Sequence, residues 1–348
     1  MTTTTFATLA HDRPLRAAIA GAGFMGGHWA RILADDPRVT IAGWADTDEP
    51  RARAQARANG LRDIVTGASL PDVLDRVRPD MLVNCTVPEA HMATTLAALE
   101  RGLPVLSEKP MAADLDQARR LVAAADDAGQ LLMVSQNRRY LPGLTALRDA
   151  AAHLGELSLV TTDLFLPHHP PPYVLAQPRP LLQEMAVHLY DAARALTGAE
   201  PEEVRHADSY RTPWSWFEGD DSLTAHIRMS GALRYTFTGC WSSDGRTTSW
   251  NGDWQVIGAL GTAHWDGEHS PVLALAGEPP RPIEHLPSDA EFPGLAEALD
   301  DFLTALHTGT APQGECHDNL RSLAMVDATL RSAITGRPTP VTLEPSGV

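Results

Sequence analysis

A glycine-rich turn between an apolar run and a helical pattern restricts most strongly what this chain can fold into. The run Ala17-Ala18-Ile19-Ala20 leads directly into Gly21-Ala22-Gly23-Phe24-Met25-Gly26, after which apolar residues recur at helical spacing. A second apolar run, residues 39–45, ends at Asp46, about 20 residues beyond the last glycine. Strand, glycine turn, helix, strand and acid, in this order, are typical of a dinucleotide-binding unit.

Each residue of the turn has a physical role in holding a dinucleotide. Gly21 permits the tight turn, Gly23 lets the backbone approach the pyrophosphate, and Gly26 lets the helix pack closely on its strand. The amides at the start of the helix are donors for phosphate oxygens. We therefore predict that the cofactor is bound by Gly21, Gly23, Phe24, Met25 and Gly26.

Asp46 bears on the choice between NAD and NADP. Its carboxylate can accept both hydroxyls of the adenosine ribose, and its charge would repel a 2'-phosphate. Residues 47–49 contain no base, although Arg51 and Arg53 are close enough in sequence to approach such a phosphate. The sequence favours NAD and leaves NADP open.

Length and composition exclude several classes of protein. A chain of 348 residues exceeds the usual single core, so we expect two domains. The net charge of -16 argues against nucleic-acid binding, because phosphate backbones are attracted by clusters of Lys and Arg. The three cysteines form no CxxC pattern, no apolar run approaches a membrane span, and the first 13 residues resemble no signal peptide. We expect a cytoplasmic protein that binds neither nucleic acid nor membrane.

The first part of the chain alternates between apolar runs and helix-length segments. Four further apolar runs follow Asp46, at residues 64–65, 81–87, 105–106 and 131–135. Such alternation predicts an α/β fold with a doubly wound parallel sheet, a Rossmann domain. Its predicted extent is residues 14–137, preceded by a flexible tail over residues 1–13.

Polar residues follow two of these apolar runs. Pro88, Glu89 and His91 follow the run at residues 81–87, and Ser107-Glu108-Lys109-Pro110 follows the run at residues 105–106. Ligands of open α/β sheets bind at the carboxyl ends of the strands. Besides the glycine turn and Asp46, we therefore predict cofactor contacts from Thr86, Pro88, His91, Glu108 and Lys109.

From residue 138 to residue 348 the pattern predicts a second domain of α+β type. Six alternating segments rich in Thr, Val, Tyr and Trp lie at residues 157–166, 204–212, 223–229, 233–240, 254–257 and 262–265. They predict a large, mainly antiparallel open sheet, and flanking helices are expected near both ends of the domain. One further helix, residues 183–196, interrupts the strands and carries Glu184, His188 and Asp191 on one face.

The chain resembles the Gfo/Idh/MocA oxidoreductases, the family of glucose-fructose oxidoreductase and inositol dehydrogenase. The matching pieces, in the same order over nearly the whole chain, are Gly21 to Gly26, Asp46, Pro88 to His91, Glu108-Lys109-Pro110, Gln136 to Tyr140 and Glu184 to Asp191. The resemblance implies that Lys109 lies beside the nicotinamide and the substrate hydroxyl. It also implies a homodimer or homotetramer formed through the large sheet. The family more often has Asp where this chain has Glu184, and the added methylene bears on substrate geometry.

These residues together predict a hydride transfer. His188 can move the hydroxyl proton because imidazole titrates near neutral pH, and Lys109 can stabilise the alkoxide. Glu184 would orient the imidazole or hold a substrate hydroxyl, and Arg138 is a further predicted substrate contact. We predict an NAD(P)-dependent oxidoreductase that acts on a secondary alcohol or ketone of a sugar, cyclitol or related polyol.

Several alternatives stay open on the sequence alone. The same fold could serve a regulator that senses cofactor or sugar, or a redox-neutral sugar-modifying enzyme with tightly bound NAD. A metal could be held by Glu184, His188 and Asp191 with His168 and His169, but hydride transfer needs no metal and we predict none. The Pro- and His-rich residues 167–173 would form a lid, an oligomer arm or an exposed stiff loop.

Overall fold

The chain divides into two compact units. The computed structural model describes residues 6–10, 12–286, 288 and 291–344. The first unit comprises residues 1–136 and 295–320, and the second comprises residues 137–294 and 321–348. The division at residue 136 lies one residue from the predicted boundary, but residues 295–320, predicted in the second domain, pack with the first.

Contacts at both ends of the first unit explain this difference. Phe6 is buried, and the amides of Ala7 and Leu9 donate to the carbonyls of Gly129 and Leu306 at 2.9 and 2.8 Å. The predicted flexible tail therefore has a packed portion in residues 6–10, while residues 1–5 and 11 lie outside the described residues. The hydrogen bond from Leu9 to Leu306 joins the beginning of the chain to residues 295–320, which belong to the same unit.

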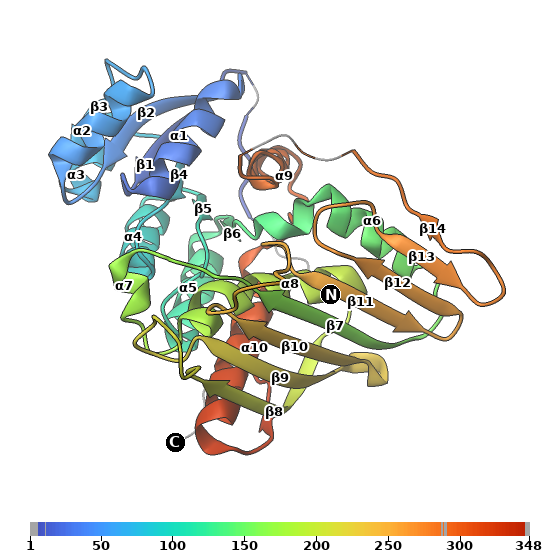
Figure 1. The fold of residues 1–348 in the computed structure, drawn as a ribbon. Helices are drawn as coiled ribbons and strands as arrows, with labels where there is room; N and C mark the ends of the chain where they lie inside the picture. The colour runs from blue at the N-terminus through green and yellow to red at the C-terminus, as the bar shows by residue number, and fades with distance from the viewer. Residues whose placement is uncertain (1–5, 11, 287, 289–290, 345–348) are drawn as a thin grey trace. The chain divides into compact units, whose positions relative to one another are not determined.

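The first unit is built on a parallel sheet (Figure 1). Its six described strands lie in the order β3-β2-β1-β4-β5-β6. Their bounds are β1 Leu15–Ala20, β2 Val39–Ala45, β3 Val65–Gly67, β4 Met81–Asn84, β5 Val105–Ser107 and β6 Leu132–Val134. β4, β5 and β6 are buried along their whole length, as parallel strands covered on both faces must be. The predicted Rossmann fold is confirmed.

Helices alternate with these strands. They are α1 Phe24–Asp35, α2 Glu49–Ala58, α3 Leu70–Val77, α4 Pro88–Leu99 and α5 Leu115–Ala128, with α9 Leu295–Thr308 added from late in the sequence. The side chains of Asp48, Ser69 and Asp114 accept a first-turn amide in α2, α3 and α5, which sets where these helices begin. The strand order reverses between β1 and β4, and ligands of such sheets bind at that switch point.

The second unit is built on an open sheet of nine described strands. The order is β14-β13-β12-β11-β7-β10-β9-β8-β15, and all neighbours are antiparallel except β7 and β10. The bounds are β7 Leu157–Phe165, β8 Pro201–Tyr210, β9 Ser222–Met229, β10 Arg234–Cys240, β11 Asp253–Gly258, β12 Gly261–Trp265, β13 Val272–Leu275, β14 Arg281–Pro282 and β15 Thr339–Pro340. The predicted mainly antiparallel sheet is confirmed, although β13, β14 and β15 were not predicted.

One face of this sheet carries the core of the unit. Along β10, Tyr235 and Phe237 are buried, whereas Thr236 and Thr238 are half-exposed on the other face. Helical segments of the unit are η1 Asn137–Tyr140, α6 Pro142–Ala151, α7 Pro172–Leu175, η2 Leu181–Ala186, α8 Val187–Thr197 and η3 Ser230–Ala232. α10, Cys316–Thr335, begins in the first unit and adds Met325 and Ala328 to this core.

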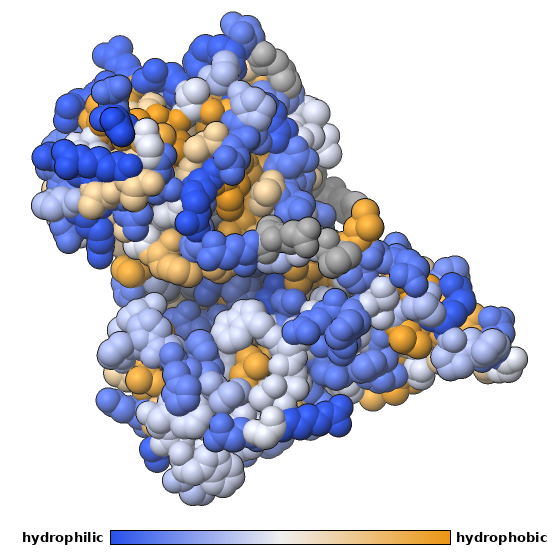
Figure 2. Space-filling view, turned by 45° about the horizontal axis from the view of Figure 1, so that its top comes forward, coloured by the Kyte–Doolittle hydropathy of each residue, from blue (hydrophilic) through white to orange (hydrophobic). Residues whose placement is uncertain are grey.

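The face of the molecule drawn in Figure 2 is mostly hydrophilic. On the face drawn in Figure 2, hydrophobic residues appear as separate orange patches among blue ones. Within the described residues, no helix is both long and apolar enough to cross a membrane.

Candidate active site

The three glycines of the first turn have different surroundings. Gly21 has a φ of +92°, and a Cβ there would collide with the carbonyl oxygen of Cys85. A Cβ on Gly26 would collide with the carbonyl oxygen of Gly21, so helix α1 packs directly on the turn. Around Gly23, by contrast, no heavy atom of the described residues, apart from the adjoining backbone and its two neighbours, lies within 4 Å of the position of a Cβ. Two glycines are therefore needed by the fold, and the third leaves open space.

The start of α1 faces that open space with exposed apolar side chains nearby. Gly23 is the N-cap residue, and within the described chain no side chain caps this helix. Phe24 is 69 % exposed and Met25 is half-buried. Val87, on the neighbouring turn after β4, is also exposed. An uncapped helix start beside exposed apolar groups is suited to an anionic ligand with aromatic rings.

Asp46 is held as a buried carboxylate at the end of β2. It accepts hydrogen bonds from the amides of Ala22 and Asp48 at 2.6 and 2.8 Å. Nη2 of Arg51 lies 2.7 and 2.9 Å from its two oxygens. Burial alone would raise the pKa of Asp46, but these donors outweigh it, and the pKa lies below its ordinary value. Asp46 is therefore ionised at neutral pH and directly linked to the glycine turn.

The turn after β4 is held by residues that the sequence only partly identified. The buried Asn84 accepts hydrogen bonds from the amide and hydroxyl of Thr86 at 3.2 and 2.7 Å. The ring nitrogens of His91 lie 2.6 and 3.0 Å from the carbonyl oxygens of Pro110 and Thr86. The side chain of His91, which was predicted as a cofactor contact, is completely buried between these two loops. Asn84 was missed, although a polar side chain inside the apolar run at residues 81–87 was a usable signal.

The loop after β5 carries Glu108 and Lys109. Oε1 of the buried Glu108 accepts from the indole Nε1 of Trp29 in α1 at 2.7 Å, and Oε2 accepts from the amide of Lys109 at 3.3 Å. Burial raises the pKa of Glu108. The Lys109–Pro110 peptide bond, which the sequence left undecided, is cis. Because Trp29 belongs to the helix that begins at the glycine turn, Glu108 ties the lysine loop to the predicted nucleotide site.

Lys109 has a property that composition alone could have revealed. The chain contains 28 Lys and Arg residues, and Lys109 is the single lysine among them. Its side chain is half-buried on the loop that follows β5. A chain that uses arginine at every other basic position uses the compact, amine-bearing cation only here.

In the second unit, the predicted helix begins with a wider turn than its sequence spacing indicated. Glu184 lies in η2, a π-helical segment, and His188 follows in α8. Oε1 of Glu184 accepts a hydrogen bond from Nε2 of Gln177 at 2.8 Å. Both Glu184 and His188 are partly exposed. The prediction of a single α-helix is thus corrected, because a π-turn changes the angle between residues four apart, and such turns frequently occur at functional sites.

Asp191, on the same helix, belongs to a buried ion pair. Nε and Nη2 of Arg139 each donate to one of its carboxylate oxygens at 2.6 Å, and the hydroxyl of Ser322 donates at 2.6 Å. Asp191 is 1 % exposed. This geometry makes Asp191 and Arg139 structural partners in the second unit.

Arg138, which precedes Arg139 in the sequence, is also buried, but it forms no ion pair with a carboxylate among the described residues. Its Nη2 donates to the carbonyl oxygen of Trp250 at 2.9 Å and lies 3.5 Å from Sδ of Met185. Burial lowers the pKa of Arg138 to about 9. Arg138 therefore contacts Met185 of η2, and Met185 is the residue that follows Glu184 in the sequence.

The Pro- and His-rich residues 167–173 pack on aromatic rings of the second unit. The rings of His169 and Trp216 stack at 4.2 Å, and His168 lies 4.8 Å from Trp241 and 5.0 Å from Trp250. The amide of His168 donates to the carbonyl of Trp241 at 2.9 Å. The segment is therefore anchored to the aromatic cluster along its first half.

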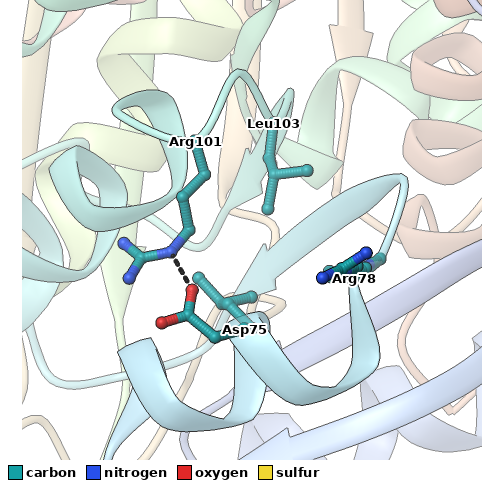
Figure 3. Close-up of a pocket in the computed structure, with 6 residues that line it drawn as sticks. Asp75, Arg78, Arg101 and Leu103 are labelled. Atoms are coloured by element: carbon teal, nitrogen blue, oxygen red, sulfur yellow. Dashed lines mark hydrogen bonds and ion pairs between the residues drawn. The ribbon is translucent and has the colours of Figure 1, made fainter.

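A pocket of about 320 Å³ lies elsewhere in the first unit (Figure 3). It is lined by Leu74, Asp75, Arg78, Pro79, Arg101 and Leu103, and Nε of Arg101 points to Asp75 at 2.8 Å. These residues precede β4 and β5, at the amino ends of the strands. Ligands of such sheets bind at the opposite edge, and the pocket contains none of the predicted site residues.

Glu315, Cys316 and His317 are close enough together to hold a metal ion among the residues that the structure describes. Glu315 already has another function, because its Oε2 accepts from the amide of His317 at 3.0 Å at the start of α10. Nε2 of His317 lies 3.1 Å from Asp126. Helix capping accounts for this cluster.

Comparison with known proteins agrees with the architecture. Residues 15–136 match the model of the GFO_IDH_MocA oxidoreductase family with an NAD-binding Rossmann fold, and residues 149–264 match the GFO/IDH/MocA C-terminal domain. A D-apiose dehydrogenase of Paraburkholderia graminis is 27% identical, with 95% of this chain and 91% of that protein aligned. An inositol 2-dehydrogenase of Rhizobium meliloti is 25% identical, with 93% and 98% aligned.

A solved structure has the same fold over nearly the whole chain. An oxidoreductase from Agrobacterium radiobacter, in complex with NAD+, L-tartaric acid and magnesium, superposes with a TM-score of 0.86 at 19% identity. The match covers 94% of this chain and 98% of that one.

Proposed function

This chain belongs to the Gfo/Idh/MocA family of oxidoreductases, and on that basis we propose that it transfers a hydride between NAD and a secondary alcohol or ketone of a sugar, cyclitol or related polyol. Two relatives are named for D-apiose and inositol, a sugar and a cyclitol, which supports this substrate class. The observation that carries the proposal is the tie between Glu108 and Trp29, because it holds the loop of Lys109 against the helix that starts at the glycine turn.

We infer that the cofactor is held by the carboxyl edge of the parallel sheet. The space around Gly23 would admit the pyrophosphate, and the first amides of α1 would donate to it. The exposed Phe24 and the half-buried Met25 would contact the cofactor beside it, with Thr86 and Pro88 from the turn after β4. His91 and Glu108 would act through these loops, by positioning Thr86 and Lys109.

A preference for NAD follows from the state of Asp46. The carboxylate is ionised, and Arg51, the nearest candidate for binding a 2'-phosphate, is already paired with it. A phosphate on the ribose would meet a buried negative charge. We therefore expect a higher kcat/KM with NAD than with NADP.

Three side chains would carry the chemistry: Lys109, His188 and Glu184. NAD, when bound, supplies the hydride acceptor or donor. Nζ of Lys109 would stabilise negative charge on the substrate oxygen, and His188 would take and return its proton. Because Nδ1 of His188 is buried, we propose that Nε2 is the atom that takes and returns the substrate proton. Glu184 would hold a substrate hydroxyl, with Gln177 fixing its carboxylate.

The test is a double-mutant cycle with Lys109→Ala and His188→Ala. Each single substitution should lower kcat by roughly 10²- to 10⁴-fold, since each removes stabilisation of the same oxygen or its proton. The double variant should be little worse than the poorer single variant, because groups that act as a unit are not additive. Turnover is measured as NADH absorbance with D-apiose, myo-inositol and related polyols.

The single lysine provides an independent control. An amine-specific acylating reagent should inactivate the enzyme by modifying Lys109, and the Lys109→Arg variant should lose this sensitivity. NAD affinity, measured by isothermal titration, should change less than a few-fold in Lys109→Ala. Full activity of Lys109→Ala would exclude the proposed role, and multiplicative losses in the double variant would contradict action on one oxygen.

We also propose that the half-exposed face of the nine-stranded sheet pairs with another copy of the chain, which would give a homodimer or a homotetramer. Light scattering would measure the oligomeric state.

The free cysteines Cys85, Cys240 and Cys316 fit a reducing, cytoplasmic compartment.

A further inference from the structure

We propose that the substrate carries a carboxylate and that Arg138 binds it. The inference rests on the proposed function and narrows it, since the second unit would then take an acidic sugar or polyol, such as a uronate or an aldonate. It depends on the surroundings of one buried guanidinium group.

The guanidinium of Arg138 is enclosed but incompletely bonded. Arg138 is 5 % exposed, and its Nη2 is bonded to the carbonyl of Trp250. Its Nη1 is buried and has no hydrogen-bond partner among the described residues. A buried N–H group without an acceptor loses its bonds to water, at a cost of about 1 to 3 kcal/mol and more for a charged group.

Its charge is also uncompensated. Burial lowers the pKa of Arg138 to about 9, so the group remains a cation at neutral pH. The adjacent Arg139 shows how the fold treats a buried arginine that it needs, with a two-pronged bond to Asp191. In the part of the chain that the structure describes, no acidic side chain forms an ion pair with Arg138. An anionic group of a bound ligand would therefore neutralise its charge.

The position of this cation connects it with the predicted substrate residues. Nη2 lies 3.5 Å from Sδ of Met185, which is in the π-helical segment η2 between Glu184 and His188. An anion bound by Nη1 would therefore lie beside the turn that carries Glu184 and leads into His188 of α8. All four residues belong to the second unit.

A second donor lies in the same neighbourhood. Nε1 of Trp241 is buried, and no hydrogen-bond partner for it lies within the described residues. The rings of Trp241 and Trp250 are nearly parallel, with 6.4 Å between their centroids and 9° between their planes. The carbonyl oxygen of Trp250 accepts the hydrogen bond from Arg138. Aromatic faces of this kind suit the C–H faces of a sugar ring, and the free indole donor suits an oxygen of the same ligand.

The charge balance favours a carboxylate over a phosphate ester. Arg138 supplies one positive charge, and the nearby His168 is kept neutral because burial lowers its pKa. A planar carboxylate has one negative charge and matches the planar guanidinium fork. A phosphate dianion would leave about one charge unpaired in a buried site.

The experiment compares matched neutral and acidic sugars. The kcat/KM with NAD is measured for D-galactose against D-galacturonate and for D-glucose against D-glucuronate, with D-glucose 6-phosphate as the phosphate probe. We expect the acidic member to exceed its neutral partner roughly 10- to 100-fold, the range that a charged hydrogen bond supplies. In Arg138→Met this ratio should fall toward one.

Two further variants separate recognition from a structural role. Arg138→Lys keeps the charge without the fork and should retain part of the acid preference, whereas the exposed Arg205→Met should leave the ratio unchanged. A merely structural effect of Arg138→Met would lower kcat/KM for both members of a pair equally. Quenching of tryptophan fluorescence by D-galacturonate provides a binding readout without turnover.

The outcomes distinguish this inference from the proposed function. Oxidation of the neutral sugars with no preference for the acids would overturn the carboxylate and leave the proposed function intact. Binding of D-galacturonate that depends on Arg138, without any NADH formation, would support the carboxylate and overturn the proposed function. Tighter binding of D-glucose 6-phosphate than of D-galacturonate would also overturn the carboxylate.

Discussion

The predicted cofactor loops and the predicted substrate region satisfy their buried polar groups to different degrees. Around the glycine turn, the polar side chains that we singled out are bonded to the protein itself, as Asp46, Asn84, His91 and Glu108 show. In the substrate region, Nη1 of Arg138 and Nε1 of Trp241 are buried without partners among the described residues. The side chains named in the first region are held by hydrogen bonds within the protein, whereas the second region has two buried donors without a partner among the described residues.

This difference fits the separate demands on the two regions. A cofactor common to a whole family can be held mainly by backbone amides and open space, which a locally bonded loop preserves. A substrate that differs from one relative to another must be recognised by side chains, and buried polar groups give the strongest discrimination. Within each region, two nearby residues with different surroundings allow this contrast to be tested.

The largest expected effect separates Arg139 from Arg138 in stability. Arg139→Met should lower the free energy of unfolding by about 3 to 5 kcal/mol, because it leaves the buried Asp191 without its partner. Arg138→Met should change it by about 1 kcal/mol or less, since no acidic partner in the described chain is left behind. Urea unfolding followed by circular dichroism measures both. Equal losses would break the contrast between a paired and an unpaired arginine.

The glycines sharpen the comparison on the cofactor side. Gly26→Ala should destabilise the protein by roughly 1 to 3 kcal/mol, because its Cβ would meet the carbonyl oxygen of Gly21. Gly23→Ala should leave the melting temperature nearly unchanged, since open space surrounds that position among the described residues.

The same pair should differ in the opposite sense in NAD affinity. The Cβ of Gly23→Ala would occupy the space proposed for the pyrophosphate, and we expect Kd to rise roughly 10-fold or more, about 1.4 kcal/mol. Isothermal titration measures this directly. NAD binding by Gly23→Ala that equals wild type would place the pyrophosphate elsewhere.

The smallest expected effect concerns pH and His91. Burial lowers the pKa of His91, opposed in part by its hydrogen bonds to two carbonyls. Below about pH 6.5 the unfolded chain therefore binds a proton that the folded chain does not, and stability decreases as the pH falls. The slope from this residue is at most about 1.4 kcal/mol per pH unit, and it disappears above pH 6.5.

The measurement compares His91→Asn with wild type by urea unfolding between pH 5 and 8. The variant should show a shallower decrease on the acidic side, and the exposed His206→Asn serves as the matched control. An unchanged slope in His91→Asn would show that the folded protein accommodates the charged ring, which could donate to both carbonyls.

Local patterns were sufficient to predict most of the first unit. The glycine turn, the spaced Asp46 and the continuous apolar runs each specify short-range geometry, and the alternation of strands with helices predicted the parallel sheet that the structure has. The short edge strands β14 and β15 were missed because each has two residues, one of them proline. The sequence placed the late helix α9 in the second domain, whereas it packs with the first unit, because helical spacing does not identify the surface on which a helix packs.

The candidate site shows the same limit. Sequence spacing placed Glu184 and His188 on one α-helix, but the wider turn of η2 has no signal in the periodicity. The fully buried position of His91 and the pairing of Arg139 with Asp191, 52 residues away, were equally hidden.

The amino-acid sequence by itself determined the class of fold, the nucleotide turn, the family and the single lysine, because each of these is written in residues that are close together in the chain. The tertiary structure decided which of two adjacent arginines is paired, which glycine borders open space and which histidine is enclosed. Those properties depend on neighbours brought together from distant segments, and only the folded chain specifies them.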